Sequence, residues 1–209
     1  MFYPRSSFIT QYWGKGKEMK MKFFTLSITS LLCSFSMQAS AQALNYNYLE
    51  AGFSTLEFDA GPLDVDGDGF DIGVSFDITD VLFIKAVIAD TEYDFNIDSS
   101  EVKAGLGAHT SLNEQTDLYG VFSLIDAEIG ANDESGYGFE VGIRHLLNSQ
   151  VELEGGFGYQ DVYDDSGSSL SFGGRYYFTN RLSGAINYTN TEVDDDDITG
   201  LRLSVRYSF

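Results

Sequence analysis

The stretch that decides the fold is "GLRLSVRYSF", residues 200–209. Polar residues alternate in it with five apolar or aromatic ones, Leu201, Leu203, Val205, Tyr207 and Phe209. A period of two is typical of a β-strand with one apolar and one polar face. Chain termini are usually polar and frayed, whereas this pattern continues to the final aromatic residue. The pattern therefore predicts that Phe209 is part of the folded structure.

The same alternation recurs along the chain from Leu44 onward. Glycine is abundant, with 22 residues, and proline is scarce, with 2, a balance that suits strands because proline removes a donor from the sheet ladder. We predict an all-β fold of ten strands, at 48–58, 70–79, 81–90, 101–112, 116–130, 136–147, 151–164, 169–179, 182–193 and 200–209.

The connections between these strands alternate in character. One set is tight, at 79–80, 113–115, 148–150 and 179–181. The other set is longer and acidic, at 59–69, 96–100, 131–135, 164–168 and 194–199. Short turns on one side and longer loops on the other are typical of outer-membrane barrels. The layout predicts a ten-stranded antiparallel transmembrane β-barrel, an up-and-down meander with acidic surface loops and both ends on the periplasmic side.

The bulk composition excludes several other classes of protein. With 43% hydrophobic and 15% aromatic residues the chain is not simply disordered, and its formal charge of −20 argues against nucleic-acid binding, which needs a basic face. The body of the chain has no apolar run of about 18 residues, so no transmembrane helix is predicted. The single cysteine, Cys33, lies in the predicted signal peptide, which leaves the mature chain without thiol chemistry.

Residues 19–43 have the features of a secretory signal peptide. A basic start, "MKMK", precedes the apolar stretch "FFTLSITSLLCSFSM", and "QASAQA" offers cleavage after Ala41 or Ala43. Residues 1–18 are interpreted as an extension from an incorrect upstream start, with Met19 or Met21 as the true one. The predicted mature barrel is 44–209, reaching the outer membrane after secretion across the inner membrane.

A soluble β-sandwich would also alternate, and the charged residues distinguish the two folds. A sandwich exposes its polar faces to water and has no reason to balance them, whereas a narrow barrel lumen needs a partner for every buried charge. Six basic and six acidic residues share the polar phase of the strands. We predict that these twelve form a charge network in the lumen: Glu50, Asp71, Asp77, Lys85, Lys103, Glu140, Arg144, Glu152, Glu154, Arg175, Arg202 and Arg206.

The chain resembles small bacterial outer-membrane β-barrel proteins of the porin-like or opacity-like kind over essentially all of 44–209. The residues that carry this resemblance are "YNYLEAGF" (46–53), "DVDGDGF" (64–70) and "TDLYGVFSL" (116–124). The terminal series Leu203, Val205, Tyr207 and Phe209 resembles the signature that the barrel-assembly machinery recognises in that family. The resemblance implies that this machinery, outer-membrane lipid and lipopolysaccharide are partners. Val121 departs from the pattern, since such proteins often carry a basic lumen residue there.

One acidic motif raises the possibility of a metal. Asp64, Asp66 and Asp68 alternate and precede Gly69, as in the first half of a calcium loop. The twelfth position of that pattern is Ser75 rather than a bidentate glutamate, and the simpler interpretation is a solvated acidic turn. We predict no cofactor, with weak calcium binding as the possible exception.

Enzymatic activity needs a nucleophile or base at the outer rim. The mature chain has two histidines, His109 and His145, and both precede tight turns at the opposite end. His109 is predicted to fill the lumen and His145 to lie at the membrane interface. We therefore predict a non-enzymatic barrel with a plugged polar lumen and a structural or surface-interaction role. A narrow porin-like diffusion channel is the first alternative, and a rim protease or lipid deacylase is the second.

Overall fold

The computed structural model describes residues 44–59, 64–94, 97–130, 132–162, 165–193 and 196–209. The predicted signal peptide at 19–43 and the upstream extension at 1–18 lie outside these residues. No helix among the described residues is long and apolar enough to cross a membrane. The ten strands are β1 (Tyr48–Asp59), β2 (Asp64–Asp77), β3 (Leu82–Tyr93), β4 (Ile97–Asn113), β5 (Thr116–Ile129), β6 (Asn132–Leu146), β7 (Val151–Val162), β8 (Asp165–Tyr177), β9 (Leu182–Val193) and β10 (Asp196–Ser208).

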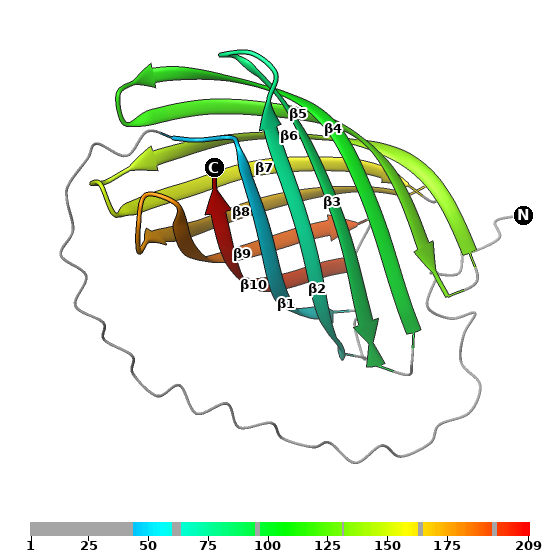
Figure 1. Cartoon of the computed structure of the whole chain (residues 1–209). Helices are drawn as coiled ribbons and strands as arrows, with labels where there is room; N and C mark the ends of the chain where they lie inside the picture. The colour runs from blue at the N-terminus through cyan, green and yellow to red at the C-terminus, as the bar shows by residue number, and fades with distance from the viewer. Residues whose placement is uncertain (1–43, 60–63, 95–96, 131, 163–164, 194–195) are drawn as a thin grey trace, which may run out of the picture. The chain divides into compact units, whose positions relative to one another are not determined.

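The ten strands form one closed antiparallel barrel in which each strand pairs with its neighbours in the chain (Figure 1). The ring closes where β1 pairs with β10, in a register that runs from Tyr48 opposite Ser208 to Asp59 opposite Asp197. The predicted all-β, ten-stranded meander barrel is therefore confirmed. Closure satisfies the backbone hydrogen bonds of every strand, which a wall in contact with lipid requires.

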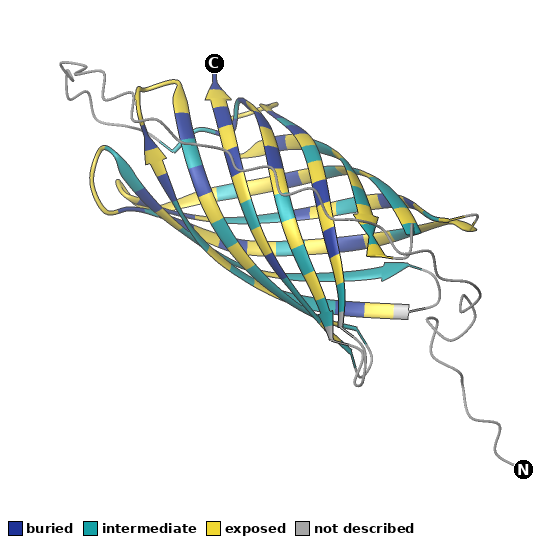
Figure 2. Cartoon of the chain, turned by 90° about the horizontal axis from the view of Figure 1, so that it is seen from below, coloured by how far each residue is buried: buried dark blue, intermediate teal, exposed yellow. Residues whose placement is uncertain are grey.

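Side chains alternate between the two faces of the wall, which Figure 2 shows as bands of burial along each strand. In β10 the polar residues Ser204, Arg206 and Ser208 are buried inside the barrel. The intervening apolar residues face outward and are about half exposed, among them Leu203, Val205, Tyr207 and Phe209. Apolar side chains that face out and polar ones that face in are the reverse of a soluble protein and suit a barrel surrounded by lipid.

The final residue belongs to this wall, as the terminal pattern predicts. The backbone N–H of Phe209 donates to the carbonyl oxygen of Asn47 at 3.2 Å, which extends the pairing of β10 with the segment before β1. The Phe209 ring lies against Phe76 of β2, with 5.3 Å between ring centroids. The C-terminus is thus held by both backbone and side-chain contacts.

The prediction of long acidic loops is wrong. Most of their residues lie in strands, and only 60–63, 94–96, 130–131, 163–164 and 194–195 separate one strand from the next on that side. The sequence pattern suggests loops here because the strands extend beyond the zone in which their outward-facing side chains are apolar. Where both faces of a strand meet water, polar residues occupy both and the period of two disappears.

The two ends of the barrel differ in charge. We call the end where β1 begins and β10 ends the terminal end; it also holds the connections at 78–81, 114–115, 147–150 and 178–181. The opposite end, the acidic end, carries an outward-facing acidic collar without a lysine or arginine. The collar consists of Glu57, Asp66, Asp68, Asp90, Glu92, Asp98, Asp126, Glu128, Asp133, Asp161, Glu192 and Asp197.

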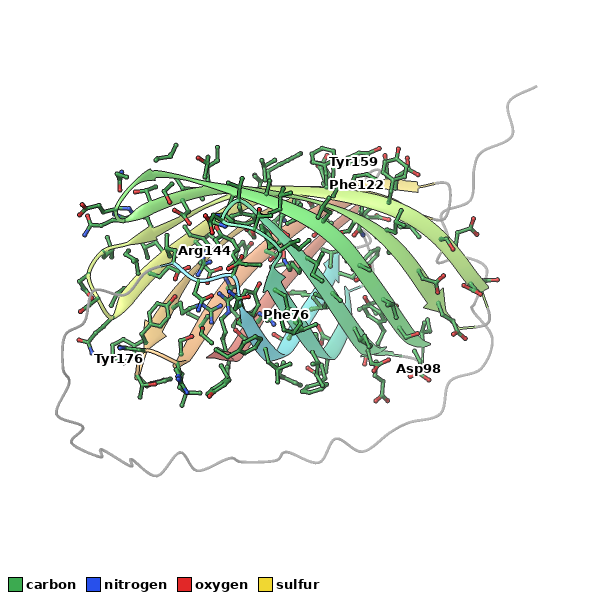
Figure 3. The ribbon with its side chains drawn as sticks, turned by 45° about the horizontal axis from the view of Figure 1, so that its top comes forward. Phe76, Asp98, Phe122, Arg144, Tyr159 and Tyr176 are labelled. Atoms are coloured by element: carbon green, nitrogen blue, oxygen red, sulfur yellow. The ribbon has the colours of Figure 1, made fainter. Side chains whose placement is uncertain are left out.

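Figure 3 shows how representative side chains are placed on this wall. Phe122 and Tyr159 lie on its outer surface, and Arg144 points into the interior. Asp98 of the collar and Tyr176 lie at opposite ends of the barrel. The interior around Arg144 is where the predicted charge network is found.

Candidate functional site

A buried set of ion pairs lies in the terminal half of the lumen. Arg144 on β6 forms a two-bond pair with Glu152 on β7, with Nε–Oε1 and Nη2–Oε2 distances of 2.6 and 3.1 Å. The Tyr177 hydroxyl also donates to Glu152. Two parallel bonds between a guanidinium and a carboxylate fix the orientation of both groups.

Glu50 on β1 is the centre of the network. Its carboxylate accepts from Arg175 Nη2 at 2.8 Å, from Arg202 Nη1 at 2.9 Å and from Arg206 Nε at 2.7 Å. Arg175 also donates to Glu154 on β7 at 3.1 Å. Since β1 and β8 are not neighbours in the barrel, the Glu50–Arg175 pair crosses the lumen. We call Glu50, Arg144, Glu152, Arg175 and Arg206 the ion-pair core.

Arg202 reaches from β10 across β1 to β2, where it forms a two-bond pair with Asp71 at 2.8 and 2.6 Å. Its path runs over Gly52, and a Cβ atom at that position would stand about 2.5 Å from the guanidinium. Glycine is needed at position 52 because the arginine lies flat against the backbone there. The lack of a side chain at Gly52 thus makes room for the Arg202–Asp71 pair.

A second set of pairs lies nearer the acidic end. Lys85 on β3 donates to Glu140 on β6 at 3.2 Å, again across the lumen, and the Tyr119 hydroxyl donates to Glu140 at 2.6 Å. Lys103 pairs with Glu101 of its own strand at 2.9 Å. We call Lys85, Lys103, Glu101 and Glu140 the upper pairs.

Exposure to water separates the two sets. The Arg175 and Glu152 side chains are 1% and 0% exposed, whereas those of Lys85 and Glu140 are 30% and 37% exposed. Water therefore reaches the upper pairs and is excluded from the ion-pair core. The more deeply buried pairs thus lie in the terminal half of the lumen, and the more exposed pairs lie nearer the acidic end.

A short segment before β1, Leu44–Asn47, enters the terminal end of the barrel, and we call it the strap. Its central residue, Tyr46, is 3% exposed. The Tyr46 ring stacks on His109 with 4.1 Å between centroids, lies 4.7 Å from Phe83, and lies 4.9 Å from the Arg144 guanidinium. Burial raises the pKa of the Tyr46 phenol to about 12, so the ring stays uncharged at neutral pH.

Polar contacts hold the strap on either side of Tyr46. The Asn45 carbonyl accepts from Arg144 Nη1 at 3.1 Å. The Asn47 side chain makes two bonds with Asp77: its Nδ2 donates to the carboxylate at 2.6 Å, and its Oδ1 accepts from the backbone N–H at 2.9 Å. With Phe83 and Val121, Tyr46 forms an apolar cluster inside the barrel. The strap thus lies against the ion-pair core at the terminal end of the lumen.

The structure places all twelve residues of the predicted charge network on inward-facing positions, but their pairing differs from the prediction in two places. Asp77 lies at the terminal mouth and contacts Asn47 rather than a lumen arginine. Lys103 pairs with Glu101, which the prediction omitted. Asp117, 3.7 Å from the His109 ring, also faces inward. The predicted balance of six against six is therefore too simple.

The sequence prediction also missed the neutral members of the site. Tyr119 and Tyr177 donate hydroxyls to the network, and Gln160 accepts from Lys103 at 3.2 Å. The alternation along the strands could have predicted the two tyrosines, because both share the phase of the polar, inward-facing residues. A tyrosine on that face needs a hydrogen-bond partner for its hydroxyl. Tyr46 gave no such signal, since it precedes the first strand.

The residues of the proposed calcium motif do not form a calcium loop. Asp66 and Asp68 lie in β2 and are exposed on its outer face, and the side chain of Asp64 lies outside what the structure describes. In a calcium loop the backbone turns so that alternate carboxylates meet at one ion, whereas an extended strand keeps the backbone positions of alternate residues about 7 Å apart. The described residues contain no group of three histidine, cysteine or acidic side chains able to hold a metal.

Both histidines lie towards the terminal end. His109 faces inward against Tyr46, while His145 lies beside Thr116, with 2.9 Å between its Nδ1 and the hydroxyl. Neither is near the acidic end, where the rim-enzyme alternative requires a base.

Comparison with known proteins identifies the family. The family model described as the outer membrane protein beta-barrel domain matches residues 27–209. The chain belongs to this family. It is accordingly an outer-membrane β-barrel of the porin, channel and surface-protein kind, and the predicted resemblance to small outer-membrane barrels is confirmed. A search of curated proteins gave no match.

Solved structures from this class of barrel share the fold. The chain is similar to the translocator domain of the autotransporter NalP from Neisseria meningitidis, with 11% identity and a TM-score of 0.50, over 78% of this chain and 88% of that one. It is also similar to an outer-membrane channel from Pseudomonas putida F1, with 9% identity and a TM-score of 0.51, over 84% of this chain and 100% of that one. At these identities the likeness shows the fold alone.

Proposed function

We propose that the protein is a closed, non-conducting barrel of the outer membrane with a structural or surface-interaction role and no enzymatic activity. The observation that supports this most directly is the ion-pair core, whose side chains are between 0% and 9% exposed. Barrels of about eight strands are filled by their side chains, and open aqueous channels belong to barrels of roughly 16–18 strands. Ten strands lie near the filled end of that range.

Conductance in planar lipid bilayers tests this proposal. The unmodified protein is expected to give only small, infrequent openings, because arginine and glutamate side chains block the lumen and satisfy one another. Large, steady conductance would contradict the closed lumen. It would favour the alternative of a narrow diffusion channel, which the partial exposure of Lys85 and Glu140 supports.

We further propose that a signal peptide at 19–43 directs secretion across the inner membrane and that the terminal end faces the periplasm. The acidic collar then lies on the extracellular side of the membrane. The outward-facing apolar side chains of the strands contact outer-membrane lipid and lipopolysaccharide. The alternation of apolar-out and polar-in residues supports the contact with lipid, and the even number of strands supports placing both ends of the chain on the periplasmic side. The barrel-assembly machinery is the proposed partner during insertion.

Deleting Phe209 is expected to lower the amount of inserted protein several-fold, since the deletion removes the end of the proposed assembly signature. It also removes the backbone bond to Asn47 and the contact with Phe76. The measurement is the fraction of heat-modifiable protein in isolated outer membranes. Phe178→Ala is a suitable control, because Phe178 is another exposed aromatic at the terminal end. Unchanged insertion after the deletion would count against a recognition role for the C-terminus.

Calcium binding at Asp64, Asp66 and Asp68 stays a prediction without support from the geometry. We expect calcium to shift the melting temperature of the parent and of a triple Asp→Asn variant by the same amount, through the diffuse charge of the collar. A larger shift in the parent would indicate a local site at these three residues.

A further inference from the structure

A cavity of about 420 Å³, widely open to solvent, lies at the terminal mouth, where the strap begins. It is lined by Leu44 and Tyr46 of the strap, by His109, and by the connection from β2 to β3, including Asp77, Thr79 and Asp80. The lining contains two carboxylates and no lysine or arginine. Asp80 has no ion-pair partner among the described residues. His109 Nε2 lies 4.0 Å from the Asp77 carboxylate, so a positive group is the complement that Asp80 lacks.

The strap itself can supply such a group. Leu44 is the residue that follows Ala43, one of the two predicted cleavage sites, and it lines the cavity. Cleavage after Ala43 would create a new α-amino group on Leu44, and α-amino groups, with pKa values of about 7.7–8.0, are largely protonated at neutral pH. Cleavage after Ala41 would instead create the new charge on Gln42, two residues earlier in the chain.

We infer that the cavity binds the α-ammonium group that signal-peptide cleavage after Ala43 creates on Leu44, and that this contact fastens the strap in the lumen. Asp77 and Asp80 supply the negative charge and the hydrogen-bond acceptors, while the Thr79 hydroxyl holds the turn by accepting from the backbone N–H groups of Val81 and Leu82 at 3.2 and 3.0 Å. Asn47 already holds Asp77 in place through two hydrogen bonds. Capture of a chain-terminal amine is a known mode of peptide recognition. Processing would thus complete the seal of the barrel, an inference that rests on the proposed closed lumen.

The test uses the processed protein purified from outer membranes. Mass spectrometry of the intact chain is expected to give an N-terminus at Leu44. Selective acetylation of the α-amine is then expected to lower the melting temperature by about 2–4 °C and to raise the frequency of bilayer openings several-fold. In an Asp77→Asn/Asp80→Asn variant acetylation should have almost no effect, because the carboxylates that bind the amine are gone. Asp98→Asn, which removes an acid at the other end, should respond as the parent does.

Two results would overturn the inference. One is a mature chain that starts at any residue other than Leu44. The other is an equal effect of acetylation on the parent and on the double variant, which would show that amine and carboxylates are not coupled. Failure of the closed lumen is a separate result, steady conductance from the unmodified protein, and the melting-temperature comparison still decides whether the amine is bound.

Discussion

Glu50→Ala is expected to lower the free energy of unfolding by about 3–5 kcal/mol, the usual cost of removing one partner of a buried ion pair. Arg175 and Arg202 would retain Glu154 and Asp71 as partners. Arg206 would keep no carboxylate, because Glu50 is its one ion-pair partner among the described residues. A guanidinium that is 6% exposed would then be left buried and uncompensated. Urea unfolding of the detergent-solubilised barrel, followed by circular dichroism, measures the loss.

Glu57→Ala is the matched control for this variant. Glu57 lies on the same strand but faces outward in the acidic collar, so its removal is expected to change stability by no more than about 0.5 kcal/mol. Bilayer recordings should also show longer openings for Glu50→Ala and unchanged behaviour for Glu57→Ala. Equal stability of the two variants would contradict the central role of Glu50 in the ion-pair core.

Tyr46→Ala is expected to destabilise the barrel by about 3–5 kcal/mol, as large-to-small substitutions of buried aromatic residues do. The variant would lose the stack on His109, the packing against Phe83 and the contact with the Arg144 guanidinium. It would also leave a hole at the terminal mouth, so bilayer openings should become more frequent. The measurements are thermal unfolding and single-channel recording on the same preparation.

Tyr46→Phe separates the role of the ring from that of its hydroxyl. The Tyr46 hydroxyl is buried and makes no hydrogen bond within the described part of the chain. Removing a buried polar atom without a partner costs little, so this variant should stay within about 1 kcal/mol of the parent and remain closed. A loss as large as that of Tyr46→Ala would show that the hydroxyl has a partner, such as an ordered water.

The period of two, together with the charges on the polar phase and the alternation of short and long connections, was sufficient to predict the barrel and the inward placement of the twelve charged residues. Lipid favours apolar side chains on the outer face of the wall, and the lumen favours polar side chains on the inner face. The residue types of Arg202 and Leu203 therefore predict that Arg202 faces inward and Leu203 faces outward. The presence of ten strands and the inward placement of Arg144 and Arg175 follow from the same rule. The sequence did not predict which acid each arginine pairs with. The partners of Glu50 come from β8 and β10, and their positions depend on the register of the closed ring.

Two other features left no readable pattern. In "DVDGDG" (64–69) the outward face carries aspartates and the inward face carries Val65 and two buried glycines, so the residues resemble a loop although they belong to β2. The strap precedes the first strand, and nothing in "LNYN" (44–47) indicates that Tyr46 turns into the lumen. Its place is set by His109, Phe83 and Arg144, which come from three different strands.

The pairing of β1 with β10 has a consequence for how the ring is assembled. Every other pairing joins strands that are consecutive in the chain and separated by a few residues, so those hairpins can form quickly and locally. Closure must bring together residues as distant as Glu50 and Arg206, 156 positions apart, and such non-local contacts are slow to form because the loop entropy is lost first. The Glu50–Arg206 pair spans that seam, and Arg202 extends over it to Asp71. A chain weakened there would stay longer as an open sheet with two unpaired edges, the form in which strands join with other molecules and aggregate.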